Sequence, residues 1–226
     1  MLTGIRNSLT YKAMREIKNL FVDEARYFFM RLRNTAEAIR DLMLDEKLGI
    51  ETGQYISKED RSLHKDMSPS VPTPYPVLRE IFEYLLPGPT DTFIDIGCGK
   101  GRAVFMAAEG NIKKAIGIEL DGNIVAVARD NLRLLKTPAV NVEFVRGDAA
   151  SADLRDGTVF FMYNPFGYKT LSRVTDNIKS SLTDNPRKIR IAYYSPVHRE
   201  IFDNEDWLKI EKVLDDVDTV IWTNAA

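Results

Sequence analysis

The stretch Phe93-Ile-Asp-Ile-Gly-Cys-Gly-Lys-Gly-Arg102 decides how the rest of this sequence is interpreted. An apolar strand pattern runs into Gly97, Gly99 and Gly101 and continues directly into a helical pattern. Glycines at a strand-to-helix turn let the backbone approach a ligand closely, and free N–H groups at the start of a helix attract an anion. The stretch therefore predicts a ligand site at the end of a buried strand.

The spacing of the glycines restricts the ligand. A dinucleotide fingerprint requires G-x-G-x-x-G, whereas this chain has G-x-G-x-G, with Lys100 and Arg102 in the remaining places. Asp95, two residues before the first glycine, suits a pyrophosphate poorly and an ammonium group well. S-adenosylmethionine carries both an ammonium and a carboxylate, so it fits the stretch better than NAD does.

Two further acids end later strand patterns. Glu119 closes Ile116-Gly-Ile-Glu119, and Asp148 closes Val142-Glu-Phe-Val-Arg-Gly-Asp148. Open α/β sheets bind ligands at the carboxyl ends of their strands, so the three acids are expected at one edge. We expect Glu119 to accept hydrogen bonds from both ribose hydroxyls and Asp148 to meet the adenine amino group.

Outward from this stretch, short apolar runs alternate with helical patterns, which is typical of a parallel sheet covered by helices. Strands are expected at Thr92–Ile96, Lys114–Ile118, Val142–Val145, Thr158–Tyr163, Lys188–Tyr194, Leu208–Leu214 and Thr219–Trp222. Helices are expected at Val77–Leu86, Arg102–Glu109, Gly122–Leu135 and Lys169–Leu182. The last two strands are expected to form a hairpin that closes the sheet.

The chain before this pattern has a different character. Apolar residues from Met14 to Met43 recur at helical spacing, so we expect an N-terminal helical extension over 1–48 that packs on the rest of the protein, with a basic surface helix as the alternative. Residues 49–76 are polar and end in a proline-rich run, and we interpret them as a connector and a candidate lid. Residues 77–226 are expected to form the domain that binds S-adenosylmethionine and catalyses the reaction.

Composition excludes several classes of protein. A formal charge of -2 gives no general argument for nucleic-acid or membrane partners. Cys98 is the single cysteine, and His64 and His198 are the only histidines, so no disulfide and no metal site is expected. No apolar run reaches the roughly 20 residues that span a bilayer, and no signal peptide is evident. We therefore expect a cytoplasmic protein without a transmembrane segment.

Asp95-Ile-Gly-Cys-Gly-Lys-Gly101 resembles motif I of the class I methyltransferases that use S-adenosylmethionine. Glu119 resembles the ribose-binding acid of that family, and Gly147-Asp148 resembles its adenine-side acid. The resemblance covers roughly Val77 to the C-terminus and implies a doubly wound sheet of seven mostly parallel strands with an antiparallel last strand. It also implies S-adenosylmethionine as the methyl donor.

The acceptor side is expected after the fourth strand, in Phe160-Phe-Met-Tyr-Asn-Pro-Phe-Gly167. Asn164, Pro165 and Phe166 resemble the Asn/Asp-Pro-Pro-aromatic motif of amine-methylating relatives, with one proline missing. An amide oxygen on Asn164 can accept hydrogen bonds from a target amine and contact the cofactor, and an aromatic ring can stack on the acceptor. Pro74-Tyr75-Pro76 resembles the segment that, in some protein-lysine methyltransferases, closes over the cofactor, which makes Tyr75 a candidate contact. A strand-to-helix turn without function is the alternative for Asn164.

These observations favour an enzyme that methylates nitrogen on a protein lysine or another amine, with the acceptor itself unidentified. Alternatives are a nucleic-acid or small-molecule acceptor, or a binding module that has lost catalysis. A nucleic acid would contact a basic face formed by Lys169, Arg173, Lys179, Arg187, Lys188 and Arg190.

Overall fold

The computed structural model describes residues 36, 38–53, 66–68, 70–135 and 141–224. The chain divides into two compact units, 1–43 and 44–226, and every contact discussed below lies within the second. Residues 38–48 are helical, whereas the predicted amphipathic stripe from Met14 to Leu32 lies outside the described residues. Within the described part of the chain, no helix has the length and apolar character needed to cross a bilayer.

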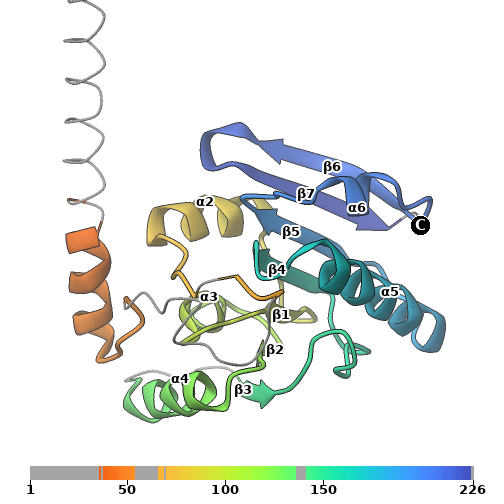
Figure 1. The fold of residues 1–226 in the computed structure, drawn as a ribbon. Helices are drawn as coiled ribbons and strands as arrows, with labels where there is room; N and C mark the ends of the chain where they lie inside the picture. Colours follow the sequence, from red (N-terminus) through yellow and green to blue (C-terminus); the bar gives the residue numbers. More distant parts are fainter. Residues whose placement is uncertain (1–35, 37, 54–65, 69, 136–140, 225–226) are drawn as a thin grey trace, which may run out of the picture. The chain divides into compact units, whose positions relative to one another are not determined.

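The second unit is built on a seven-stranded sheet with the order β3-β2-β1-β4-β5-β7-β6 (Figure 1). Its strands are β1 (Thr92–Ile96), β2 (Lys114–Glu119), β3 (Asn141–Arg146), β4 (Val159–Tyr163), β5 (Arg190–Tyr194), β6 (Leu208–Leu214) and β7 (Thr219–Asn224). Neighbouring strands from β3 to β5 are parallel, whereas β7 runs antiparallel to both β5 and β6. The predicted doubly wound sheet with an antiparallel last strand is confirmed.

Helices cover both faces of the sheet. They are α2 (Tyr75–Leu85), α3 (Arg102–Ala108), α4 (Gly122–Leu134), α5 (Tyr168–Asp184) and the single turn α6 (Glu200–Asp203). One hydrophobic core joins Leu78 of α2, Val104 of α3 and Ala128 of α4 to strand residues such as Phe93. The other joins α5 and α6 to the residues that alternate with these, such as Ile94. Alternation along buried strands therefore produces two cores.

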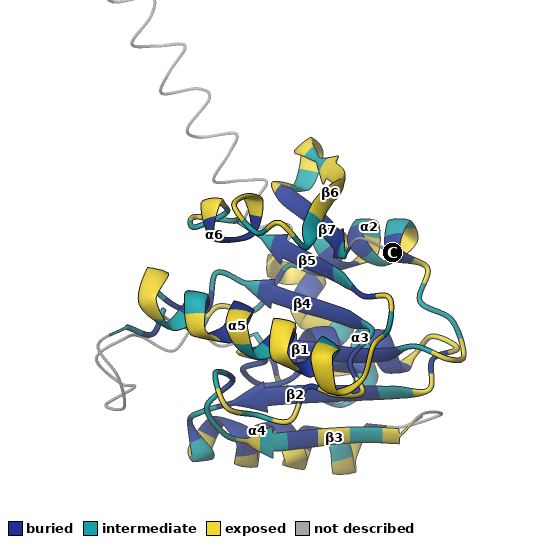
Figure 2. Ribbon diagram, turned by 90° about the vertical axis from the view of Figure 1, so that its right-hand side faces the viewer, coloured by how far each residue is buried: buried dark blue, intermediate teal, exposed yellow. Residues whose placement is uncertain are grey.

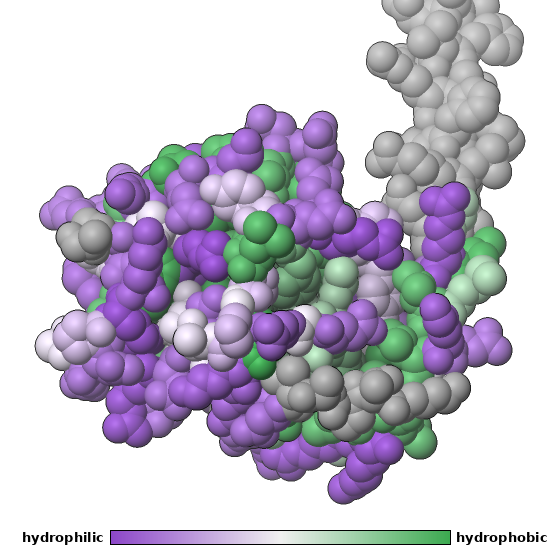
Figure 3. Space-filling model, turned by 180° about the vertical axis from the view of Figure 1, so that it is seen from behind, coloured by the Kyte–Doolittle hydropathy of each residue, from purple (hydrophilic) through white to green (hydrophobic). Residues whose placement is uncertain are grey.

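Burial decreases toward the edges of the sheet. All five residues of β1 are buried, whereas β3 and β6 at the two edges carry mostly exposed or half-buried side chains (Figure 2). Hydrophilic side chains cover most of the face drawn in Figure 3, with hydrophobic ones in smaller groups between them. The apolar interior is thus concentrated around β1 and β4, the pair at which the strand order reverses. Ligands of open α/β sheets bind beside such a reversal.

Element boundaries agree with the sequence patterns to within a few residues. The largest difference at a helix start is in α2, which begins at Tyr75 rather than Val77 because Pro76 lies in its first turn, where a missing N–H costs no hydrogen bond. The turn α6 has no counterpart in the predicted elements, since four residues are too few to show a helical period.

Candidate functional site

A cavity opens at the carboxyl ends of β1 to β4. Its free space, including the open solvent at its mouth, is about 1080 Å³. The loops after these strands line it together with residues 66–67 and 70–73 and the first turns of α5. Of the sequence-predicted site residues, Asp95, Gly97, Gly99, Glu119, Asp148, Pro165 and Phe166 line this cavity.

The glycine loop adopts a backbone that other residues rarely take. Gly97, Gly99 and Gly101 have φ angles of 79°, 53° and 94°, in the left-handed region that favours glycine. A β-carbon on Gly101 would lie 2.6 Å from Phe144 Cζ, and one on Gly97 would lie 2.7 Å from Pro165 Cβ. The loop therefore packs tightly on the β3 side and directly against the predicted acceptor segment.

Asp95 and Glu119 are buried acids on the cavity wall, with exposed fractions of 4% and 2%. Burial raises the pKa of Asp95 well above its ordinary value, and the nearby Glu119 carboxylate raises it further. Glu119 is held in place because its Oε2 accepts a hydrogen bond from the Gly99 N–H at 3.2 Å and its Oε1 accepts one from the Asp121 N–H at 3.0 Å. This pair of acids favours a ligand that brings positive charge and hydroxyl donors.

Asp148 follows β3 and is more exposed than the other two acids. Its Oδ1 accepts a hydrogen bond from the Ala150 N–H at 2.9 Å. Its Oδ2 lies 3.5 Å from Nη2 of Arg173, which reaches across from α5. Since β2 lies between β1 and β3, the three acids line the cavity in the spatial order Asp95, Glu119, Asp148.

The predicted acceptor segment forms the wall after β4. Pro165 and Phe166 line the cavity, whereas Asn164 is not among the described residues that line it. Asn164 has a φ angle of 35°, and its Oδ1 accepts a hydrogen bond from the Tyr193 hydroxyl at 3.0 Å. Burial, the largest cause, raises the pKa of Tyr193 to about 12, so the hydroxyl stays a donor at neutral pH. The side chain of Asn164 is thereby oriented by β5.

Aromatic side chains surround this wall. Phe161, Tyr163 and Phe166 line the cavity. The Tyr163 ring packs on that of Tyr194 with 4.4 Å between centroids, and burial raises the pKa of the Tyr163 hydroxyl. Met67 pairs with Phe166 through an isolated antiparallel bridge, so Met67 lies along the same wall. The wall is suited to a flat or cationic group.

Tyr75 lies beside the glycine loop but is not among the described residues that line the cavity. Its hydroxyl donates a hydrogen bond to Asp45 Oδ1 at 2.7 Å, and burial is the main cause of the raised pKa of this hydroxyl. The centre of the ring lies 4.5 Å from the Arg102 guanidinium carbon. Tyr75 therefore contacts a cavity residue rather than the cavity itself.

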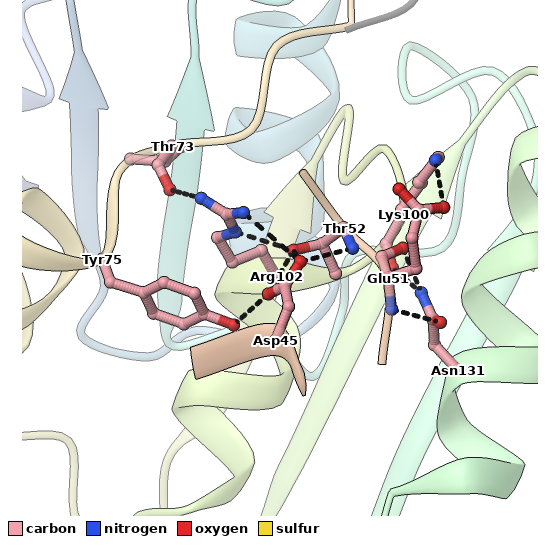
Figure 4. A network of polar contacts seen from close by, with 8 residues as sticks. All are labelled: Asp45, Glu51, Thr52, Thr73, Tyr75, Lys100, Arg102 and Asn131. Carbon is pink, nitrogen blue, oxygen red and sulfur yellow. Dashed lines mark hydrogen bonds and ion pairs between the residues drawn. The ribbon is translucent and has the colours of Figure 1, made fainter. Parts of the chain in front are cut away.

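Sequence reasoning assigned no ligand role to Arg102, and of the residues around it only Tyr75 was a candidate ligand contact (Figure 4). Arg102 is 4% exposed and lines the cavity. Its Nε donates to Thr52 Oγ1 at 2.7 Å, its Nη1 donates to the Thr73 carbonyl at 3.2 Å, and its Nη2 lies 3.5 Å from Asp45 Oδ2. No local pattern links Asp45 or Thr52 to the glycine motif, because about fifty residues separate them in the sequence.

A second set of contacts was also missed. Asn131 of α4 accepts a hydrogen bond from the Glu51 N–H at 3.0 Å and donates to the Glu51 carbonyl at 3.0 Å and the Lys100 carbonyl at 3.3 Å. Lys100 Nζ forms an ion pair with Glu51 at 2.6 Å. Residue 51 is thus tied to both α4 and the glycine loop. One sequence signal existed, since Asn131 lies on the apolar stripe of α4, where a buried amide needs partners.

The cavity fits S-adenosylmethionine on observations of its own residues. A buried aspartate with a raised pKa is stabilised as a carboxylate when an ammonium binds beside it. The glycine backbone leaves no room for β-carbons, Glu119 can accept further hydrogen bonds on its oxygens, and Arg102 supplies positive charge on the same wall.

Comparison with known proteins agrees with this fold. A family model described as a methyltransferase domain matches residues 93–185. A protein-lysine N-methyltransferase from Saccharolobus islandicus is 30% identical over 115 residues, which cover 50% of this chain and 67% of the relative. The chain belongs to the class I methyltransferase family that uses S-adenosylmethionine, and S-adenosylmethionine is its methyl donor.

Solved structures support the same conclusion. The RNA methyltransferase from Salinibacter ruber in complex with S-adenosylhomocysteine matches with a TM-score of 0.52 and 26% identity over 68% of this chain and 92% of that one. A precorrin 8W decarboxylase from Methanobacterium thermoautotrophicum shares the fold, with a TM-score of 0.51 and 20% identity over 70% of this chain and 93% of that one.

Proposed function

We propose that this methyltransferase transfers the methyl group of S-adenosylmethionine to the side-chain nitrogen of a protein lysine. The observation that carries the proposal is the contact between the glycine loop on the donor side of the cavity and Pro165 on the acceptor side. The glycine loop packs on Pro165 so closely at Gly97 that a β-carbon would not fit, and Tyr163 and Phe166 extend the wall from there. Likeness to the Saccharolobus islandicus protein-lysine N-methyltransferase supports the acceptor class.

On the donor side, each acid takes one part of the ligand. Asp95 binds the ammonium of the methionine end, because this positive charge stabilises a carboxylate that is otherwise buried beside Glu119. Glu119 accepts hydrogen bonds from the ribose hydroxyls while its contacts to Gly99 and Asp121 hold it still. Asp148, half-exposed beside Arg173, accepts from the adenine amino group.

On the acceptor side, Pro165 and Phe166 form the surface that meets the lysine. A carboxamide oxygen has two lone pairs, so Oδ1 of Asn164 can accept a hydrogen bond from the target amine as well as the one from Tyr193. The aromatic rings of Tyr163 and Phe166 stack against the aliphatic stem and the cationic end of the substrate.

The lysine ammonium must lose a proton to water before it attacks, because only the neutral amine has a lone pair. Beyond that step, the chemistry asks little of acid–base groups in the protein. The bound donor supplies a methyl group already activated by its sulfonium. The residues of the chain therefore contribute mainly by holding the acceptor nitrogen in line with the methyl group and by excluding water. Such alignment alone can increase the reaction rate strongly. Because the donor is already activated and the protein mainly aligns the acceptor, the mechanism needs no nucleophile–base pair, and the sequence motifs suggest none.

The test is to incubate the protein with methyl-labelled S-adenosylmethionine and candidate acceptors: lysine-rich protein, RNA and small amines. Protein products are hydrolysed completely, and methylated amino acids are identified by mass spectrometry. We expect label in methyllysine. A Phe166→Ala variant should lose transfer roughly tenfold or more while keeping donor affinity, since an aromatic–cation contact contributes about 0.5–2 kcal/mol and alignment adds to it.

The matched control is Tyr168→Ala, because Tyr168 is an exposed aromatic residue two positions away that does not line the cavity among the described residues. This variant should keep normal transfer. Label found only in RNA or only in a small amine, with protein lysine unmodified, would contradict the proposed acceptor.

A further inference from the structure

A groove lies at the same edge of the sheet as the cavity, on the far side of the wall after β4. The strand order continues from β4 through β5 and β7 to β6 (Figure 1). The loop after β5 contributes residues 195–197 and 199, and the turn between β6 and β7 contributes residues 213–215 and 218–220. We call this the edge groove. Its free space, including open solvent, is about 640 Å³.

The edge groove is joined to the wall after β4 by neighbouring strand ends. Tyr163 of that wall pairs in register with Tyr194 of β5, their rings lie 4.4 Å apart, and the next residue, Ser195, lines the groove. Asn164, Ser195 and Asp218 have φ angles of 35°, 48° and 43°, and the Ser195 N–H donates to the Asp218 carbonyl at 2.9 Å. Backbone in this sparsely populated region costs free energy and is common at binding sites.

The edge groove combines apolar surface with carboxylates that are open to a ligand. Val197 and Val213 have exposed fractions of 61% and 37%. Asp215, Asp216 and Asp218 in the turn are all exposed. Within the part of the chain that the structure describes, none of these three carboxylates forms an ion pair. The groove therefore presents negative charge beside apolar side chains.

This combination suits basic side chains. Lysine and arginine pack their aliphatic stems on apolar surface while their charged ends stay in water, within reach of carboxylates. The cation of the groove, Arg199, does not cancel the acids of the turn, because its Nε already pairs with Asp203 at 2.8 Å. A nucleic acid, in contrast, would bring its phosphates against these acids.

We propose that the edge groove binds basic residues of the substrate protein, about three to four positions along the chain from the target lysine. Strands lie about 4.8 Å apart, so β7 and β6 are roughly 10 and 14 Å from β4. An extended chain advances about 3.3–3.6 Å per residue, which sets the number of positions. The inference rests on the proposed lysine acceptor and identifies the kind of segment that carries it.

The first experiment compares poly-L-lysine with Nα-acetyl-lysine amide, an acceptor too short to reach the groove. Initial rates with methyl-labelled S-adenosylmethionine give KM and kcat for both. In the triple variant Asp215→Asn, Asp216→Asn, Asp218→Asn, KM for poly-L-lysine should rise roughly tenfold, with kcat within about twofold, since three exposed ion pairs are lost. KM for the small acceptor and donor affinity should not change. Asparagine also tolerates the left-handed backbone at position 218, so the fold is kept.

The second experiment measures binding without the reaction. Fluorescence anisotropy follows a labelled oligo-arginine peptide on protein saturated with S-adenosylhomocysteine. The wild type should bind it more weakly as salt rises from about 0.05 M to about 0.3 M, because screening shortens the range of the charges. The triple variant should bind it roughly tenfold more weakly at low salt and show little salt dependence.

The matched control removes the same charge at the opposite edge of the sheet. Glu109→Gln, Asp156→Asn and Asp184→Asn are exposed positions where the chain approaches the amino ends of β2, β4 and β5. This control variant should keep the wild-type KM for poly-L-lysine and the wild-type affinity for oligo-arginine.

Unchanged KM and affinity in the groove variant would overturn the inference, as would equal losses in the two triple variants. No binding of oligo-arginine by the wild type would overturn it as well. Groove-dependent binding of oligo-arginine without transfer to either lysine acceptor would support the groove as a site for basic segments and overturn the lysine acceptor. The two failures are therefore distinguishable.

Discussion

At the scale of single residues, the donor site is built from groups that cost the empty protein stability. Asp95 is buried beside another acid, and its raised pKa means that the folded chain holds a proton there more tightly than the unfolded chain. Its contribution to stability therefore falls as the pH rises above the unfolded pKa. Such a cost is typical of a residue kept for binding rather than for folding.

Asp95→Asn should therefore stabilise the protein without ligand and weaken donor binding. Near neutral pH the amide avoids the burial of a charge, so we expect the melting temperature to rise by a few degrees, where 1 kcal/mol corresponds to roughly 2–4 °C at this chain length. Affinity for S-adenosylhomocysteine should fall roughly ten- to hundredfold. Thermal melts and calorimetry measure the two effects.

The exposed Asp130→Asn provides the control, since it should change neither quantity. In the wild type, donor affinity should also rise with pH until Asp95 is ionised in the free protein. A variant at Asp95 that lowers both stability and affinity would contradict this account of the residue.

Gly101→Ala tests the backbone of the glycine loop. The φ angle of 94° makes alanine costly there, and so does the crowding by Phe144 and Phe105, whose ring atoms lie within 3.0 Å of the position that a β-carbon would take. Left-handed strain and overpacking together should lower the free energy of unfolding by about 2–4 kcal/mol, measured by urea denaturation. Gly147→Ala in the same cavity should be nearly neutral, because its β-carbon would meet only Val145 Cγ1 at 4.0 Å.

The acids and glycines of the site could be predicted from the sequence because each lies at a strand end and the motif is local. Glu119, for example, follows its strand without a break, and a parallel sheet brings such ends together. The environment of Arg102 could not be predicted, since Asp45, Thr52 and Thr73 reach it only through tertiary packing. The helix and strand periods of the sequence do not predict contacts between residues that are so far apart in the chain.

At the scale of elements, the segment 44–53 lies beside the candidate donor site although it precedes the sheet by some forty residues. Asn131 of α4 hydrogen bonds to both backbone groups of Glu51, and Asp45 accepts hydrogen bonds from the N–H and the hydroxyl of Thr52. The segment is thereby held as a short wall beside the glycine loop. The segment supports the glycine loop through its place in the fold, and no sequence pattern indicates this role.

Asn131→Ala should release this wall. Two backbone groups of Glu51 and the Lys100 carbonyl lose a partner, so we expect the free energy of unfolding to fall by about 1–3 kcal/mol. Donor affinity should fall as well, because the glycine loop loses a support through Lys100. Asp130→Ala on the same helix removes only an exposed ion pair with Arg133 and should cost less than about 0.5 kcal/mol. Equal effects of the two substitutions would exclude a specific role for Asn131.

Most elements could be predicted because strand and helix periods differ clearly between Thr92 and Asn224. The doubly wound arrangement with an antiparallel last strand followed from the family resemblance rather than from periodicity, since alternation along a strand does not identify its neighbours. The placement of Asn164 shows a further limit. The Asn-Pro-Phe motif identifies Asn164 as a candidate residue, but it does not predict how the side chain is oriented. That orientation depends on a hydrogen bond from Tyr193 on the neighbouring strand β5.

At the scale of the whole molecule, one sheet brings three acids from successive strands to a common edge, and the strand order β3-β2-β1 places them in sequence along the cavity. The reversal between β1 and β4 opens the space in which, in the proposed function, donor and acceptor meet. Family membership gives the donor, and the aromatic wall after β4 supports the proposed lysine acceptor. The central claim is the orientation of the donor across these strand ends.

A crystal structure of the complex with S-adenosylhomocysteine tests that claim most directly. We predict the amino group within hydrogen-bonding distance of Asp95, the ribose hydroxyls on Glu119 and the adenine amino group beside Asp148, at about 2.7–3.2 Å for each N–H···O contact. A nucleoside bound in the reverse direction, or bound away from the carboxyl ends of β1, β2 and β3, would contradict the account.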